Sequence, residues 1–184
     1  QGYSSAASDV YKRQGQEYRL NLGGAYQVTN ALTAIEALTC AGVTPAHIAM
    51  GIERARIPAR MELLPGDILL DGGHNPQAAR AGRSALEDSG YERRTAFIGM
   101  MNTKDHRAFL QEILPCFDRV YFCDGFSEGE VPAEELRRIS GLDGAEIFHS
   151  PREALKFARR DREGGLMYFG GSFYFAAAVR EYLV

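Results

Sequence analysis

The chain has 184 residues, of which 45% are hydrophobic and 24% charged, and its formal net charge is −3. Such a composition is typical of a globular protein, and the absence of a basic excess argues against nucleic acid as a partner. The three cysteines form no CxxC pair and no apolar run is long enough for a membrane span, so we expect a cytoplasmic protein and assign no metal ligand in this chain.

The first 57 residues contain a stretch without periodicity and a short strand–helix–helix unit. Residues 1–14 are rich in serine and alanine, and we set them aside as adapter sequence or a disordered tail. The elements expected next are a strand over 17–22, a helix over 25–41 with Val28, Leu32, Ile35 and Leu38 on one face, and a helix from Thr44–Pro45 to about residue 55. One strand and two helices are too few for a core of their own, so we place a domain boundary between residues 57 and 58.

The rest of the chain alternates between strands and helices. The expected strands are 61–64, 68–71, 95–99, 119–123, 146–148 and 166–170, and the expected helices are 77–89, 104–114, 133–139, 151–160 and 173–184. Repeated strand–helix units predict an α/β fold with a Rossmann-like, mainly parallel sheet of about six strands and helices on both faces. A Pro-Gly-Asp hairpin turn (65–67) joins the strand 61–64 to the strand 68–71, so the strand 61–64 is the antiparallel exception, at or near an edge.

One strand–loop–helix junction carries most of the polar chemistry. The strand 68–71 ends at an aspartate, and the sequence Asp-Gly-Gly-His-Asn-Pro (71–76) leads into a helix. Ligands bind at the carboxyl ends of strands in such sheets, and a helix N-terminus favours an anion such as phosphate. The alternative is a structural turn in which Asn75 caps the helix and Pro76 takes its first position. Spacing alone leaves both interpretations open.

Five motifs together resemble a known family. They are Leu-Gly-Gly-Ala-Tyr-Gln-Val-Thr-Asn-Ala (22–31), Pro-Ala-Arg-Met-Glu (58–62), Asp-Gly-Gly-His-Asn-Pro (71–76), Thr-Lys-Asp (103–105) and Gly-Gly-Ser-Phe (170–173). Their order resembles folylpolyglutamate synthase/dihydrofolate synthase, a member of the Mur ligase superfamily of ATP-dependent amide-forming ligases. The resemblance implies a Mur ligase C-terminal domain over 58–184, after a remnant of the central ATP-binding domain over 15–57. Because no GxxxxGK[ST] phosphate loop is present, we expect the fragment to be inactive alone.

The resemblance also implies residues that bind the nucleotide. Asn30 would contact adenine with support from Gln27, Arg60 would neutralise phosphate, and Asp71 would accept hydrogen bonds from the ribose. Each residue also has a structural alternative. Asn30 and Gln27 would lie on an exposed helix face, Arg60 would be an ordinary surface arginine, and Asp71 would only place a charge at a helix N-terminus. Replacing Asp71 by alanine in a full-length parent is expected to cut turnover while barely changing the melting temperature, and the same is expected for His74.

Further residues would bind the other substrates. His74 is assigned the catalytic role, in contact with the transferred phosphate or the incoming glutamate. Lys104 would pair with the glutamate carboxylate, and Ser172 would bind the amino acid or cap a helix, whereas Asp105 is expected to be only a helix cap. The other histidines, His47, His106 and His149, show no partner pattern.

The reaction implied by the resemblance joins glutamate to dihydropteroate or a reduced folate through an acyl phosphate. The expected partners are therefore ATP, L-glutamate and the pteroate or folate, with Mg²⁺ held mainly by residues outside this chain and a monomeric full-length protein. Two alternatives remain: another Mur-type amino-acid ligase that acts on a peptidoglycan precursor, and a non-catalytic nucleotide-binding α/β module.

Overall fold

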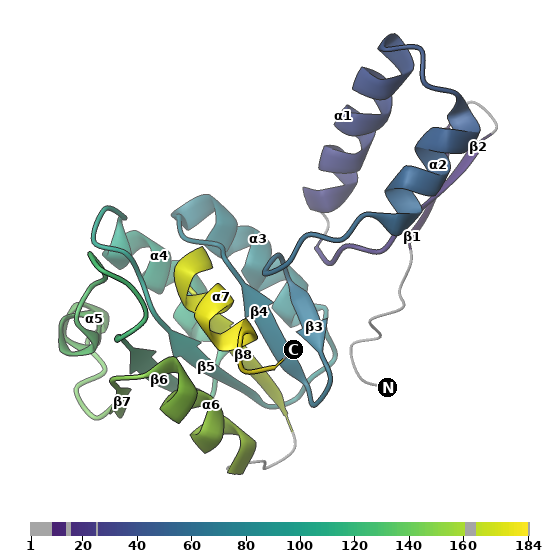
Figure 1. The fold of residues 1–184 in the computed structure, drawn as a ribbon. Coiled ribbons are helices and arrows are strands. Elements are labelled where there is room, and N and C mark those ends of the chain that lie inside the picture. The colour runs from purple at the N-terminus through teal and green to yellow at the C-terminus, as the bar shows by residue number, and fades with distance from the viewer. Residues whose placement is uncertain (1–8, 14–15, 25, 161–164, 184) are drawn as a thin grey trace.

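The computed structural model describes residues 9–13, 16–24, 26–160 and 165–183 (Figure 1). Its first elements are β1 (Asp9–Arg13), β2 (Gln16–Leu20), α1 (Tyr26–Cys40) and α2 (Pro45–Arg54). β1 and β2 form an antiparallel ladder of their own, and Figure 1 shows α1 and α2 standing away from the larger sheet.

The strand β1 lies within residues 1–14, the stretch that we set aside as adapter sequence or a disordered tail. Residues 9–13 pair along their whole length with β2, from Asp9 opposite Leu20 to Arg13 opposite Gln16. A strand over 16–20 needs a partner for its backbone N–H and C=O groups, and β1 supplies one on its edge. The remainder of that stretch lies outside the described residues.

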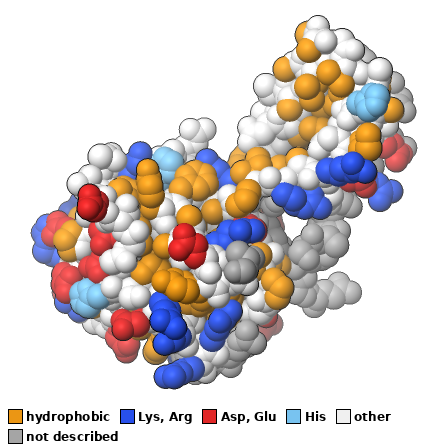
Figure 2. All heavy atoms as spheres, viewed as in Figure 1, with side chains coloured by type: hydrophobic (Ala, Val, Ile, Leu, Met, Phe, Trp, Pro, Cys, Tyr) orange, Lys and Arg blue, Asp and Glu red, His pale blue; other side chains and the backbone are white. Residues whose placement is uncertain are grey.

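A small core holds the N-terminal elements together. It consists of Tyr18 and Leu20 from β2, Ile35 from α1, and Ile48 and Ile52 from α2. The apolar face expected on the first helix is only partly buried, because Ile35 is enclosed whereas Leu32 and Leu38 are exposed. Figure 2 shows apolar side chains gathered on the surface of this unit.

A six-stranded sheet organises the rest of the chain. Its strands are β3 (Glu62–Leu64), β4 (Ile68–Asp71), β5 (Arg94–Ile98), β6 (Arg119–Cys123), β7 (Ile147–Phe148) and β8 (Leu166–Gly170). They lie in the order β3-β4-β8-β5-β6-β7, and every pair is parallel except β3 with β4. The predicted fold class is confirmed, including the antiparallel strand at one edge.

Helices cover both faces of this sheet. They are α3 (Pro76–Glu87), α4 (His106–Ile113), α5 (Ala133–Ser140), α6 (Pro151–Arg160) and α7 (Phe173–Arg180), with a short 3₁₀ helix at Leu114–Cys116. Side chains of α3, α4 and α5 share one core with the strands, and those of α6 and α7 share the other. Among the described residues, no helix is both long and apolar enough to span a bilayer.

Alternation along the strands decides which polar groups meet. Tyr168 of β8 belongs to the core under α3–α5, and its neighbour Phe169 belongs to the opposite core. Leu69 of β4 lies on the same side as Tyr168, so the period of two places Asp71 on that side as well. The sheet therefore directs Asp71 and Tyr168 toward each other.

Candidate functional site

The carboxyl ends of β4, β8 and β5 meet at one edge of the sheet. These three strands are adjacent and parallel, so the loops that follow them share that edge. The amide of Gly99, after β5, donates to the carbonyl of Gly170 at 3.1 Å. A Cβ on Gly171 would lie 2.9 Å from the Gly99 carbonyl oxygen, which shows how closely the two loops pack.

Phe173 is the centre around which this edge is assembled. The Arg60 guanidinium lies 4.3 Å from the Phe173 ring centroid, and the His74 ring lies 6.1 Å from it in an edge-on arrangement. A Cβ on Gly72 would approach the Phe173 Cδ1 atom to 2.2 Å, so the first glycine of the loop is needed for the ring to pack there. One aromatic ring thus brings together a cation from the linker and an imidazole from the β4–α3 loop.

The linker before β3 is bound to the same loop. Ala59 and Met61, on either side of Arg60, both have positive φ, at 55° and 49°. Non-glycine residues adopt this region at a cost, and such positions cluster where function requires a set geometry. The Gly72 amide donates to the Ala59 carbonyl at 2.6 Å, which fixes the segment that carries Arg60.

The carboxylate of Asp71 faces the interior. Its residue is only 4% exposed, and it accepts hydrogen bonds from the Tyr168 hydroxyl at 3.2 Å and from the amides of Gly73 and Met61. Burial raises the pKa of Asp71, and these hydrogen bonds together with the charge of Arg60 oppose that rise. The arrangement argues against our expectation that Asp71 can be removed without loss of stability.

His74 is positioned to present one ring nitrogen outward. Its Nδ1 atom lies 2.9 Å from the Gly72 carbonyl oxygen, which can only accept, so Nδ1 carries the proton. In the neutral ring the other nitrogen, Nε2, is then an acceptor. The helix that follows is capped by Asn75, whose side chain accepts from the Ala78 amide at 2.8 Å, and Pro76 takes its first position. The structural turn is thus present, and it leaves the half-buried imidazole accessible.

Two further candidates lie at the same edge. Ser172 is 2% exposed and its hydroxyl accepts from the Tyr174 amide at 3.1 Å, so it caps α7 as the second of its two interpretations predicts. Lys104 lies in the loop after β5 and is half-buried. Within the described part of the chain its ammonium group has no hydrogen bond or ion pair. The expected cap at Asp105 is confirmed, because its side chain accepts from the Ala108 amide.

Asn30 and Gln27 lie apart from this group, on α1. Gln27 is 2% exposed and its Oε1 atom accepts from the Asn30 side chain at 2.9 Å, while Asn30 itself is exposed. The structure therefore supports Gln27 as the residue that orients Asn30. It does not bring Asn30 into contact with Arg60, His74 or Lys104.

Sequence reasoning missed the roles of two aromatic residues. Phe173 was quoted only as the last letter of a motif, and Tyr168 was not singled out at all. The available signals were the strand period, which puts Tyr168 opposite the acid, and the need for glycine at 170, where a Cβ would lie 2.3 Å from the Tyr168 hydroxyl.

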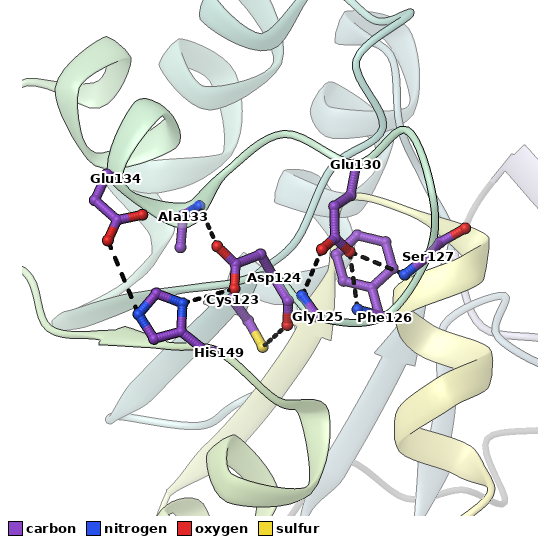
Figure 3. Close-up of polar contacts among 9 residues, drawn as sticks. All are labelled: Cys123, Asp124, Gly125, Phe126, Ser127, Glu130, Ala133, Glu134 and His149. Carbon is purple, nitrogen blue, oxygen red and sulfur yellow. Dashed lines mark hydrogen bonds and ion pairs between the residues drawn. The ribbon is translucent and has the colours of Figure 1, made fainter.

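A second polar cluster occupies the same edge farther along, at the ends of β6 and β7 (Figure 3). Asp124, Glu134 and His149 each offer a ligand atom, and these atoms all lie within 4.8 Å of one another.

Comparison with known proteins places this geometry in a family. The model of the family "Mur ligase, glutamate ligase domain" matches residues 59–173. The chain is 28% identical over 177 residues to folylpolyglutamate synthase of Lacticaseibacillus casei, covering 89% of this chain and 40% of that protein. It is 34% identical over 125 residues to a probable bifunctional folylpolyglutamate synthase/dihydropteroate synthase of Halobacterium salinarum, covering 66% of this chain and 15% of that protein.

A peptidoglycan enzyme and a solved structure match as well. UDP-N-acetylmuramate–L-alanine ligase of Psychrobacter cryohalolentis is 30% identical over 158 residues, covering 78% of this chain and 32% of that protein. The structure of E. coli FolC in complex with DHPP and ADP superposes with a TM-score of 0.76 at 28% identity, covering 83% of this chain and 38% of that one. The chain thus spans less than half the length of each of these proteins.

Proposed function

We propose that this chain, which belongs to the Mur ligase family through its glutamate ligase domain, is the C-terminal part of an ATP-dependent ligase that adds glutamate to dihydropteroate or a folate. The observation that carries the proposal is the grouping of Arg60, Phe173 and His74 beside the N-terminus of α3. A cation and a helix N-terminus at one end of the sheet suit an anionic, phosphate-bearing substrate, and the imidazole acceptor beside them suits the amine of an amino acid.

The reaction needs several charged groups to be held together. In the first step a carboxylate oxygen of the pteroate or folate attacks the γ-phosphorus of ATP, giving an acyl phosphate and ADP. The amine of glutamate then attacks the acyl carbon, an amide bond forms, and inorganic phosphate leaves with a proton lost from nitrogen. Positioning and neutralisation of charge account for most of the catalysis in such a sequence.

Within this scheme each residue has a distinct task. Arg60, held over Phe173, neutralises phosphate charge. His74 Nε2 accepts from the amine of the incoming glutamate when the ring is neutral, and it donates to the transferred phosphate when the ring is protonated. Lys104 pairs with the glutamate carboxylate. Ser172, which is 2% exposed and whose hydroxyl is engaged as a cap, shapes the loop that faces the amino acid.

Asp71 and the metal require a different assignment. Both the burial of Asp71 and its three hydrogen-bond donors, Tyr168, Gly73 and Met61, place its negative charge within the loop. Because this carboxylate is buried and already accepts three hydrogen bonds, it is a poor ligand for Mg²⁺, and we assign no step to a metal at this end of the sheet. We propose that Asp71 positions the β4–α3 loop for the nucleotide, and that Mg²⁺, the adenine contact of Asn30 and the phosphate loop involve the part of the enzyme outside this chain.

A second candidate is supported by the match to UDP-N-acetylmuramate–L-alanine ligase. Its 30% identity to this chain is close to the 28% identity of folylpolyglutamate synthase. The two candidates differ in the acceptor and the amino acid. The test is ADP release by the full-length protein, measured with dihydropteroate or folate plus glutamate, and separately with UDP-N-acetylmuramate plus L-alanine. We expect turnover only with the first pair. Turnover only with the second pair would reassign the enzyme, and ATP binding without either turnover would support a non-catalytic module.

Substitutions in that full-length protein test the site itself. Arg60→Ala and His74→Ala should each lower kcat at least tenfold, equivalent to about 1.4 kcal/mol of transition-state stabilisation, with little change in melting temperature. Arg56→Ala is the matched control, because the Arg56 guanidinium bonds to the carbonyls of Glu53 and Ala55 and not to Phe173. Equal loss of activity in all three variants would overturn the assigned roles.

A further inference from the structure

The cluster at the ends of β6 and β7 is built from three separate junctions (Figure 3). Asp124 follows β6, Glu134 lies in the first turn of α5, and His149 follows β7. The Asp124 Oδ1 atom lies 2.9 Å from His149 Nδ1, and the Glu134 Oε1 atom lies 3.8 Å from His149 Nε2. Asp124 and His149 are 25 residues apart, so no short spacing motif marks them and the sequence analysis assigned them no role.

The backbone holds these junctions in a set arrangement. The Asp124 amide donates to the Phe148 carbonyl at 3.0 Å, and the Asp124 Oδ2 atom accepts from the Ala133 amide at 2.8 Å. Gly125 has a φ of +73°, and a Cβ there would lie 2.1 Å from the His149 carbonyl oxygen. The loops after β6 and β7 are therefore in direct backbone contact, which fixes the spacing of the imidazole and the carboxylate.

The three side chains differ in exposure: that of Asp124 is held nearly buried, whereas those of Glu134 and His149 have room to rotate at the surface. The Asp124 side chain is 14% exposed, whereas those of Glu134 and His149 are 52% and 63% exposed. A tetrahedral ion with bonds near 2.1 Å needs its ligand atoms about 3.4 Å apart. The 2.9 Å separation joins Asp124 to the Nδ1 atom of His149 and the 3.8 Å separation joins Glu134 to its Nε2 atom, and one ion can bind only one of these nitrogens. The three ligand atoms lie within 4.8 Å of one another, so rotation of the exposed Glu134 side chain toward Nδ1 brings all three donors to one ion.

We propose that Asp124, Glu134 and His149 bind one divalent transition-metal ion, with water completing its coordination. Imidazole together with carboxylate favours Zn²⁺ and its neighbours over Mg²⁺ and Ca²⁺, which prefer oxygen alone. The ion takes the position of the proton shared between His149 and Asp124, and that proton is released to solvent.

Two nearby groups are excluded as ligands by their own bonds. The Glu130 carboxylate accepts from the amides of Gly125, Phe126 and Ser127, which uses both of its oxygens. The Cys123 thiol is buried, burial raises its pKa far above the ordinary range, and its sulfur donates to the Asp124 carbonyl. A neutral, enclosed thiol is a poor metal ligand, which leaves the three exposed or partly exposed groups.

Proton competition gives the proposed site a signature. The hydrogen bond to Asp124 raises the pKa of His149, and the charges of Glu134 and Glu153 act in the same direction. A metal that displaces this proton must bind more weakly as the pH falls from 8 to 6. A site made of carboxylates alone would keep its affinity across that range.

The test is calorimetric titration of the 184-residue chain with ZnCl₂, with MgCl₂ as the competing hard ion. We expect one saturable Zn²⁺ site whose affinity falls at least about tenfold in His149→Gln and in Glu134→Gln. Glu135→Gln is the matched control, since it removes the same charge from the same helical turn while Glu135 is paired with Arg138. His47→Gln, on α2, is the control for loss of an exposed histidine. Equal weakening in the controls, or the absence of saturable binding in the wild type, would overturn the proposal.

A second measurement locates the ion without any substitution. Mn²⁺ broadens the amide resonances of nearby residues, so we expect broadening centred on residues 124, 134 and 149. Broadening spread over the acidic surface would show non-specific binding and overturn the site. The result is independent of the ligase proposal, because none of these three residues belongs to the Arg60–Phe173–His74 group.

Discussion

The two polar clusters at this sheet edge occupy equivalent positions and have opposite character. In each, an aspartate lies at the carboxyl end of a parallel strand and a helix follows: Asp71 is the last residue of β4 and precedes α3, and Asp124 directly follows β6 and precedes α5. Asp71 is 4% exposed and accepts from a tyrosine hydroxyl and two amides. Asp124 accepts from one amide and faces an exposed histidine and an exposed glutamate.

What covers each aspartate explains the difference. The linker 59–61 and the Phe173 ring close over the β4–α3 loop, and Tyr168 reaches Asp71 from the neighbouring strand. Next to β6 lies the two-residue strand β7, the last strand of the sheet, and Asp124 there faces the exposed side chains of His149 and Glu134. In this sheet the covered strand end holds a buried carboxylate, whereas the strand end beside β7 leaves its polar side chains exposed.

Among the substitutions that test this comparison, Gly72→Ala is expected to have the largest effect on stability. The new methyl group would overlap the Phe173 ring, which would have to leave its place between Arg60 and His74. We expect a loss of about 2–3 kcal/mol in the free energy of unfolding, measured by urea denaturation. Gly51→Ala in α2 is the control, because nothing lies within 4 Å of its Cβ position, and it should gain about 0.5–1 kcal/mol. Similar losses in both variants would show that the loop is not closely packed.

A smaller effect is expected when the scaffold loses one hydrogen bond. Tyr168→Phe keeps the ring in the core and removes the hydroxyl that donates to Asp71. Because that donor favours the ionised carboxylate, its loss should raise the pKa of Asp71 further and cost about 1–2 kcal/mol of stability at neutral pH. Tyr182→Phe, at a 47% exposed position, should change stability by less than about 0.5 kcal/mol. An unchanged Tyr168→Phe protein would mean that the Asp71 loop does not depend on this bond.

The same comparison shows which features of the fold and the site could be predicted from the sequence. Periodicity and turn chemistry predicted the sheet, its antiparallel edge and the caps at Asn75 and Asp105, because those features depend on neighbouring residues. Burial of Asp71 depends on Tyr168, 97 residues away, and on the folding back of the linker. No local pattern carries such information. The same holds for β1, which pairs with β2 although the sequence of that stretch shows no periodicity.

Some site assignments remain predictions for the same reason. Asn30 lies on α1, whose core is separate from those of the large sheet, and Leu32 and Leu38 on that helix are exposed. Whether Asn30 meets a nucleotide held by Arg60 depends on contacts between these two parts and the rest of the enzyme. His74 and Lys104, in contrast, share an edge because the strand order β4-β8-β5 requires it.

The smallest expected effect concerns the open cluster and the pH dependence of its ion pair. The pKa of His149 is raised in the folded protein by Asp124, relative to about 6.5 in an unfolded chain. Its stabilising contribution is therefore complete below that unfolded value and is lost as the pH rises through the higher folded value. In metal-free buffer, wild type should exceed His149→Gln in melting temperature at pH 5.5, and the difference should vanish by pH 9. Because the histidine is exposed, added salt should shrink the difference as well. A difference that grows with pH would mean that His149 is held as the neutral ring, and the open cluster would then resemble the buried one in its electrostatics.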